Sequence, residues 1–175
     1  MLEGEKEIIE KAKNGEKEAF GLLYDYYHPR IYRFIFLKVS NKQDAEDITH
    51  QVFLSAWQNI KNYEPQGFPF SSWLYKISRN AVIDFYRSKK NEISLEEVGD
   101  GLNDELRIDK IDLKIQMEKV MKALKKLKPE YQDIIIMRFV DDLSIKEVAK
   151  VLDKSEGAVK IMQHRAINSL KKLLI

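Results

Sequence analysis

Two amphipathic segments near the C-terminus, separated by a very short turn, constrain the fold of this chain more than any other feature. The first segment, SIKEVAKVL, begins with Ser144 and has Glu147 three residues later. This is a capping box, in which each side chain bonds the other's backbone N–H. After Asp153 and Lys154, Ser155 is expected to cap the second segment, which runs to the chain end. A connection this short allows only a sharp corner, so the sequence predicts a helix-turn-helix.

Apolar side chains on the two segments are spaced to pack against each other across this corner. They are Val148, Ala149 and Leu152 on the first segment and Val159, Met162, Ala166 and Leu170 on the second. The second helix then presents Lys160, His164 and Arg165 outward, which supplies charge for phosphates and donors for base edges. This face predicts binding to duplex DNA, although helical pairs with a tight turn also occur in proteins that never touch DNA.

The rest of the chain is also expected to be helical. Among 175 residues there are only 7 Gly and 4 Pro, and Leu, Ile, Lys and Glu are abundant. N-terminal helices are expected over 5–13, 16–39 and 42–59 and from 71 or 72 to about 90, and four more helices in the C-terminal part. Asn41 should cap the third helix, and Pro29 should start a new helix or kink the second. The predicted core-facing side chains of the third helix are Ala45, Ile48, Val52, Ala56 and Ile60. Those of the fourth are Leu74, Ile77, Ala81 and Phe85, and those of the first C-terminal helix are Met117, Val120, Met121 and Leu124.

Charge and composition divide the chain into three parts. Residues 91–114 contain 3 basic and 8 acidic residues, a net charge of −5, together with a Gly-Asp-Gly sequence. The flanking ranges 1–90 and 115–175 have net charges of +2 and +5. The expected fold class is therefore all-α, with two small helical domains joined by a flexible acidic linker, the C-terminal one a four-helix domain with the helix-turn-helix.

The sequence lacks the motifs of an enzyme. It has no cysteine, and therefore no disulfide, no thiolate metal site and no nucleophilic thiol. It also has no Gly-rich phosphate loop, nucleophile elbow or metalloprotease motif. We therefore expect no catalysis and no cofactor. The N-terminus does not resemble a signal peptide, and the most apolar short run, 134–137, is too short to span a membrane. The expected location is the cytoplasm, without membrane insertion.

Aromatic and basic residues alternate over the range 61–90. The aromatic ones are Tyr63, Phe68, Phe70, Trp73 and Tyr75, and the basic ones are Lys61, Lys76, Arg79, Arg87, Lys89 and Lys90. Such a mixture suits single-stranded nucleic acid, whose bases stack on rings while its phosphates meet positive charge. The alternative is that Phe70 and Trp73 anchor the loop to the core. For any one ring the core interpretation is favoured, whereas for the group the two interpretations are equally supported.

Polar side chains follow the outer face of the helix expected over 42–59. They are Asp44, Asp47, Gln51, Ser55 and Gln58, which are typical of a solvated face. Two other interpretations of these residues stay open, a metal site and the active site of a nuclease. Asp47 and His50 are three residues apart, but no second pair of ligands completes a metal site. The carboxylates Asp44, Glu46 and Asp47 could bind Mg²⁺ in a small nuclease.

Three segments, in this order and spacing, resemble the bacterial sigma-70 family in its extracytoplasmic-function (ECF) branch. DAEDITHQVFLSAWQNI is similar to the helix that docks on the clamp of RNA polymerase, and FSSWLYKISRNAVIDFYRSKK to the helix that reads the promoter −10 element. The stretch from LKPEYQ to NSLKKL is similar to the domain that reads the −35 element. The resemblance covers nearly the whole chain apart from the linker. It implies a transcription initiation factor that binds RNA polymerase core, directs it to promoters and helps to open the −10 region.

The resemblance also implies roles for individual residues. Domain 1–90 would bind polymerase and the melted −10 element, linker 91–114 would pass near the path of the nascent RNA, and domain 115–175 would bind the duplex −35 element. The implied polymerase contacts are Asp44, Asp47 and Gln51. The implied −10 contacts are Lys61, Phe68, Trp73, Lys76, Arg79, Asn80 and Arg87, with the loop over 61–70 forming the lip that receives an unpaired base. The implied −35 contacts are Ser155, Lys160, His164 and Arg165. An anti-sigma factor is a further partner that such proteins often have.

Two departures from the family pattern lie in the helix-turn-helix. Asp153 occupies the corner position where Gly is common, and Ile161 and Met162 replace a pair that is often more polar. The main alternative to a sigma factor is a stand-alone helix-turn-helix regulator. It would leave 41–90 without a role, and such proteins usually dimerise on paired half-sites.

Overall fold

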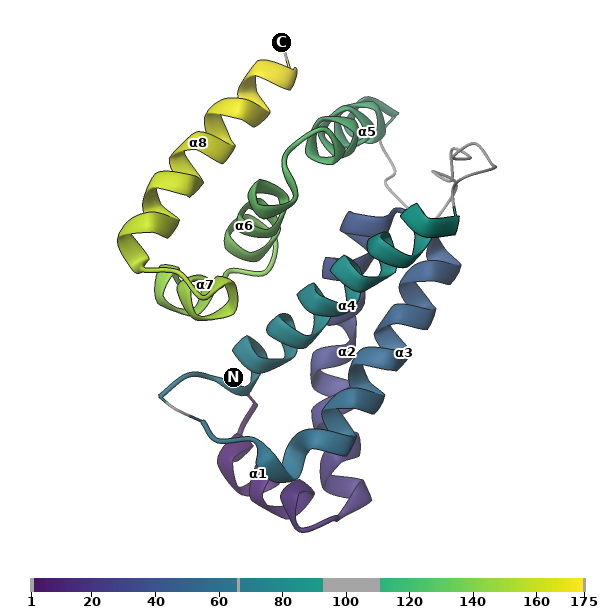
Figure 1. Ribbon diagram of the computed structural model, residues 1–175, viewed down its shortest axis with the longest axis vertical. Coiled ribbons are helices and arrows are strands. Elements are labelled where there is room, and N and C mark those ends of the chain that lie inside the picture. The colour runs from purple at the N-terminus through teal and green to yellow at the C-terminus, as the bar shows by residue number, and fades with distance from the viewer. Residues whose placement is uncertain (1, 66, 93–110, 175) are drawn as a thin grey trace. The chain divides into compact units, whose positions relative to one another are not determined.

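The described part of the chain is entirely helical and forms two units. The computed structural model describes residues 2–65, 67–92 and 111–174, and its regular structure in these ranges is α-helix with one 3₁₀ turn (Figure 1). The chain divides into two compact units, Met1–Glu96 and Glu97–Ile175. This confirms the expected all-α class with two helical units. Most of the expected linker, 93–110, lies outside the described residues, whereas 91–92 end one helix and 111–114 begin the next.

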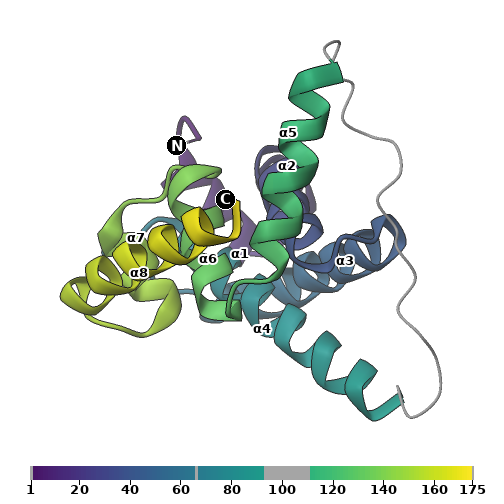
Figure 2. The same ribbon diagram turned by 90° about the horizontal axis from the view of Figure 1, so that it is seen from above.

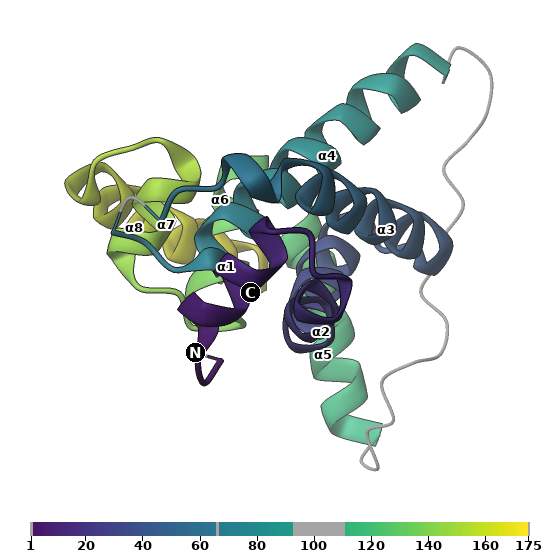
Figure 3. The same cartoon turned by 90° about the horizontal axis from the view of Figure 1, so that it is seen from below.

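Three long helices form the body of the N-terminal unit. Helices α2 (Lys17–Val39), α3 (Lys42–Asn59) and α4 (Phe70–Glu92) pack against one another (Figure 1). The short α1 (Glu5–Lys13) packs on α2 and on the 3₁₀ turn η1 (Ile60–Asn62). Figure 3 shows α1 beside α2. Pro29 lies inside α2 and does not start a new helix. The core of the unit consists largely of fully buried aliphatic and aromatic side chains, which include Leu23, Ile31, Phe34, Ile35, Val52, Phe70, Leu74 and Tyr75.

Helix α3 forms as its sequence predicts. The Asn41 side chain accepts a hydrogen bond from the backbone N–H of Asp44 at 2.9 Å and so caps the helix. The predicted core-facing residues, from Ala45 to Ile60, are all buried. This agreement follows from the regular spacing of apolar residues, which is a local signal.

Helix α4 differs from its prediction in two ways. It begins at Phe70, so Ser71 and Ser72 lie inside it and neither is the residue before the first turn. Beyond its first turn, the buried side chains are Leu74, Tyr75, Ser78 and Val82, whereas Ile77, Ala81 and Phe85 are only half-buried. The Ser78 hydroxyl donates to the Leu74 carbonyl at 2.7 Å, and this bond satisfies a buried polar group.

The C-terminal unit is a four-helix domain, as expected. It consists of α5 (Ile111–Lys125), α6 (Pro129–Phe139), α7 (Ile145–Leu152) and α8 (Glu156–Leu174). Helix α8 contacts the other three, and Figure 2 shows α6, α7 and α8 together. The core centres on α6, where Ile134, Ile136 and Met137 are fully buried.

The apolar stripe predicted for α5 is only partly buried. Met121 and Leu124 belong to the core, but Met117 and Val120 are 38% and 37% exposed. The N-terminal half of that stripe therefore does not contribute to this core. Over the described ranges, no helix is both long enough and apolar enough to cross a membrane.

Candidate nucleic-acid interface

The predicted helix-turn-helix corner is present between α7 and α8. The backbone N–H of Ser144 donates to the Glu147 carboxylate at 2.7 Å, and the N–H of Glu147 donates to the Ser144 hydroxyl at 3.2 Å. The capping box is therefore confirmed. Asp153 at the end of α7 has φ 51°, in the left-handed region that favours glycine. An aspartate tolerates this region better than most residues, so the corner keeps the backbone geometry that a glycine would give.

Helix α6 holds α8 at two points. In the turn just before α8, Lys154 pairs with Glu130 of α6 at 3.4 Å. Further along, Arg138 of α6 donates from Nε to the Gln163 side-chain oxygen at 3.1 Å and from Nη1 to the carbonyl of Leu143. Together with the burial of Val159 and Ala166, these contacts orient α8 on the core of its unit.

The four residues expected at the −35 element lie on the exposed side of α8 or just before it. Lys160, His164 and Arg165 are exposed, whereas Val159 and Ala166 on the opposite side are fully buried. Ser155 is also exposed, and its hydroxyl accepts the backbone N–H of Ala158 at 3.1 Å, so it caps α8. The structure thus brings these residues together beside the start of a firmly held helix.

The five aromatic residues around the loop at 61–70 do not form one group. Tyr63, Phe70 and Tyr75 are buried, and only Phe68 and Trp73 remain partly accessible. The Tyr63, Phe70 and Trp73 rings pack against one another with centroids 5.0–5.3 Å apart. Tyr63, Phe70 and Tyr75 therefore belong to the core, and a stacking surface for bases is limited to Phe68 and Trp73.

A buried carboxylate on α1 connects that helix to the same aromatic cluster. Tyr27 donates a hydrogen bond to the buried Glu5, and its ring packs on Phe70 at 5.6 Å. Burial, together with the nearby Glu5 charge, raises the pKa of Tyr63 to about 12. Burial and the bond to Glu5 also raise the pKa of Tyr27. Sequence reasoning missed Glu5, because a glutamate in the first turn of a helix usually indicates a solvated position.

The polar residues expected near the −10 element differ in exposure. Lys61, Asn80 and Arg87 are exposed, and Lys76 and Arg79 are half-buried. Arg87 forms an ion pair with Asp84 at 3.3 Å on the surface of α4. The two half-buried groups keep part of their surface accessible to phosphates.

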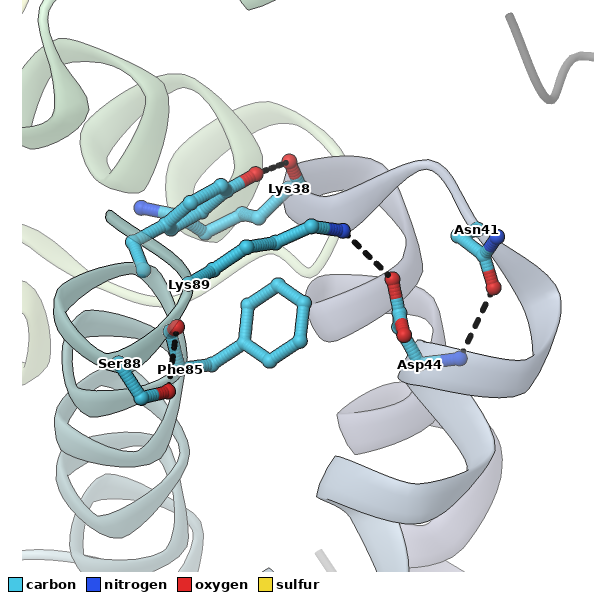
Figure 4. A network of polar contacts seen from close by, with 7 residues as sticks. Lys38, Asn41, Asp44, Phe85, Ser88 and Lys89 are labelled. Carbon is cyan, nitrogen blue, oxygen red and sulfur yellow. Dashed lines mark hydrogen bonds and ion pairs between the residues drawn. The ribbon is translucent and has the colours of Figure 1, made fainter. Parts of the chain in front are cut away.

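The polar stripe on α3 separates into two kinds of residue. Asp47 and Gln51 are exposed, but Asp44 is half-buried and pairs with Lys89 of α4 at 3.5 Å (Figure 4). The Lys89 ammonium also lies 5.1 Å from the centroid of the Phe85 ring. Asp44 therefore takes part in a contact between α3 and α4, which sequence spacing alone did not reveal.

Another bond ties α4 to the end of α2 beside this pair. The Tyr86 hydroxyl donates to the Lys38 carbonyl at 2.8 Å. Burial raises the pKa of Tyr86, and the nearby Asp44 charge raises it further. Within the described ranges, no three side chains of the types that bind metal ions lie close enough together to hold one.

Two family models match the chain, one in each unit. Sigma-70 region 2 matches residues 23–92, and Sigma-70 region 4 matches residues 117–170. The first match begins within α2 and leaves α1 outside it.

Curated relatives match over nearly the full length of the chain. The ECF RNA polymerase sigma factor BldN of Streptomyces coelicolor is 37% identical over 96% of this chain, which spans 65% of that protein. The ECF RNA polymerase sigma factor SigW of Bacillus subtilis is 30% identical over 97% of this chain and 96% of its own length. A solved structure of the sigma factor RpoE of Bartonella quintana, in complex with the anti-sigma factor NepR, has a similar fold. Its TM-score is 0.73 at 24% identity, covering 89% of this chain and 96% of RpoE.

Proposed function

The chain belongs to the ECF branch of the sigma-70 family, and on this premise we propose how its two units divide the work of a sigma factor. As a sigma factor, it directs RNA polymerase core to promoter DNA. The observation that carries the proposal is the presence, on one chain, of a region 2 unit followed by a region 4 unit. A stand-alone helix-turn-helix regulator would need only the second, and no observation favours it.

The N-terminal unit is proposed to bind polymerase and the melted −10 element. The exposed Asp47 and Gln51 on α3 are the proposed polymerase contacts, with Asp44 beside them at the junction with α4. For the −10 element we propose one group of residues on η1, the following loop and α4. It consists of Lys61, Phe68, Trp73, Lys76, Arg79, Asn80 and Arg87. Phe68 and Trp73 can stack on unpaired bases, and the basic groups can hold the neighbouring phosphates.

The C-terminal unit is proposed to dock α8 in the major groove of the duplex −35 element. Lys160 and Arg165 supply charge for phosphates, and His164 can reach base edges. The start of α8, with Ser155 at its cap, offers backbone N–H groups to a phosphate. The contacts of α6 with α8 and with the turn before it support this role, because they orient the helix before DNA arrives.

Three further parts of the proposal follow from family membership. The chain itself performs no chemical step, because polymerase makes the RNA. It acts in the cytoplasm, where that polymerase works. An anti-sigma factor is a further proposed partner, as such a factor binds the sigma factor RpoE of similar fold.

The test of the proposed function is reconstitution with purified bacterial RNA polymerase core. The full chain should be retained by immobilised core, and the resulting holoenzyme should give run-off transcripts from promoters that core alone does not use. A chain that binds duplex DNA as a dimer and shows no affinity for core would instead be a stand-alone regulator.

Reversing the charge of one exposed residue on α3 should weaken binding to polymerase core without affecting the fold. Asp47→Lys should weaken binding to polymerase core by about tenfold, because it places a positive charge in the proposed interface. Since Asp47 is exposed, the free energy of unfolding should change by no more than about 0.5 kcal/mol. The measurement is the Kd for core, with circular dichroism to check the fold.

The matched control is Glu46→Lys, the same charge change on the exposed neighbouring residue outside the proposed contacts. It should leave the Kd for core nearly unchanged. If both variants lost affinity for core equally, the effect would come from net charge and not from a specific contact. If Asp47→Lys bound core as tightly as the wild type, Asp47 would not belong to the interface.

A further inference from the structure

The outward face of α8 has an apolar side chain near its middle. Ile161 is 55% exposed, and the buried Val159 and Ala166 mark the opposite face. Successive residues of a helix are about 100° apart around the axis. This spacing places Ile161 near the middle of the outward face, with Lys160 and Arg165 toward its two edges.

An exposed isoleucine is common on protein surfaces, but this one lies in an otherwise polar setting. Its neighbours on the outward face are His164 and Asn168, whose side-chain nitrogens lie 2.9 Å apart. Isoleucine can neither donate nor accept a hydrogen bond, so Ile161 cannot read the donors and acceptors of a base edge. The apolar feature of base edges in the major groove is the 5-methyl group of thymine.

A glycine one turn earlier leaves space beside Ile161. A Cβ atom added at Gly157 would meet only the Ser155 hydroxyl, at 4.0 Å, so packing within the protein does not require glycine here. Glycine also weakens a helix relative to alanine. An open position on the same outward face is what close approach to the floor of a groove requires.

We propose that Ile161 determines −35 specificity by packing against the 5-methyl group of a thymine in the duplex. Lys160 and Arg165 hold phosphates on either side of the groove, and the missing side chain at Gly157 admits the base edge. This inference rests on the proposed function of α8 as the −35 helix. It adds that α8 selects a thymine and that it does so through the 5-methyl group of that base.

The test removes the thymine 5-methyl group from the DNA and, separately, the Ile161 side chain from the protein. Holoenzyme made from the full chain and polymerase core first selects duplexes from a library with a randomised −35 element. Each thymine of the selected element is then replaced singly by deoxyuridine, which lacks only the methyl group. Kd values are measured for the wild-type, Ile161→Ala and Lys160→Ala holoenzymes.

One deoxyuridine substitution should weaken the wild-type complex about three- to fivefold, the effect of one buried methyl group. The same substitution should leave the Ile161→Ala complex unchanged. Lys160→Ala should bind more weakly and with a smaller salt dependence, but should keep the full sensitivity to deoxyuridine. Because Ile161 is exposed, its alanine variant should fold normally, which circular dichroism will check.

Two results would overturn the inference while leaving the proposed function intact. One is a selected element in which no deoxyuridine substitution matters, and the other is equal sensitivity in the wild-type and Ile161→Ala complexes. A holoenzyme that selects no −35 element at all would instead overturn the proposed function, and the inference with it.

Discussion

Replacing Phe68 with alanine should lower run-off transcription from a fully duplex promoter by about tenfold. Extruding a base from duplex costs a few kcal/mol, and stacking on an aromatic ring returns roughly 1–3 kcal/mol per base. Of the aromatic residues in the loop and the first turn of α4, Phe68 and Trp73 remain partly accessible, so loss of one ring should raise the free energy needed to open the duplex. A template already melted across the −10 element should restore most of the activity, because the opening step is no longer needed.

Lys160→Ala is the contrasting variant for this experiment. Its defect lies in docking α8 on duplex DNA, so the melted template should restore it much less. Run-off transcripts from duplex and melted templates are compared for both variants, with circular dichroism to check that each is folded. Equal rescue of both variants, or of neither, would contradict the division of labour between the two units.

The second large effect concerns the stability of one unit alone. Ile136 is fully buried at the centre of α6, so Ile136→Ala removes core contacts and leaves a cavity. The C-terminal unit should lose about 2–5 kcal/mol of its free energy of unfolding. The N-terminal unit has its own core and should keep its stability.

Two spectroscopic signals can distinguish the units in a urea titration. Both tryptophans, Trp57 and Trp73, lie in the N-terminal unit, so their fluorescence reports on that unit. Circular dichroism reports on the helices of both. The variant should show an early dichroism transition with an unchanged fluorescence midpoint, and a shifted fluorescence midpoint would show that the units unfold together. Ile161→Ala deletes the same atoms from an exposed position and should change stability by no more than about 0.5 kcal/mol.

Local signals explain why parts of this fold could be predicted from the sequence. The cap at Asn41 and the capping box at Ser144 each depend on residues within one helical turn, and both are present in the structure. The three- and four-residue spacing of small and aliphatic side chains along α3 likewise determined its buried face. In each case the preference of a short segment agrees with its final environment.

The features that were missed depend on contacts between distant segments. Helix α4 buries Tyr75 against Phe34 of α2, with ring centroids 5.4 Å apart, and this contact cannot be read from the spacing of α4 alone. The burial of Glu5 depends on Tyr27, 22 residues away in the sequence. For the same reason, the sequence favoured the core for any one aromatic residue near the loop but could not show that Tyr63, Phe70 and Tyr75 are buried while Phe68 and Trp73 stay partly accessible.

The two attachments of α8 to α6 also have a mechanical consequence. Glu130 and Arg138 lie on one helix and contact the turn before α8 and Gln163 within it, so a swivel of α8 would break these contacts and uncover the buried Val159 and Ala166. We therefore expect the proposed recognition helix to move as a rigid body with its unit. Variation in the distance between the two promoter elements must then be absorbed outside this unit or by twisting of the DNA. We therefore do not expect tolerance to promoter spacing to come from α8 itself.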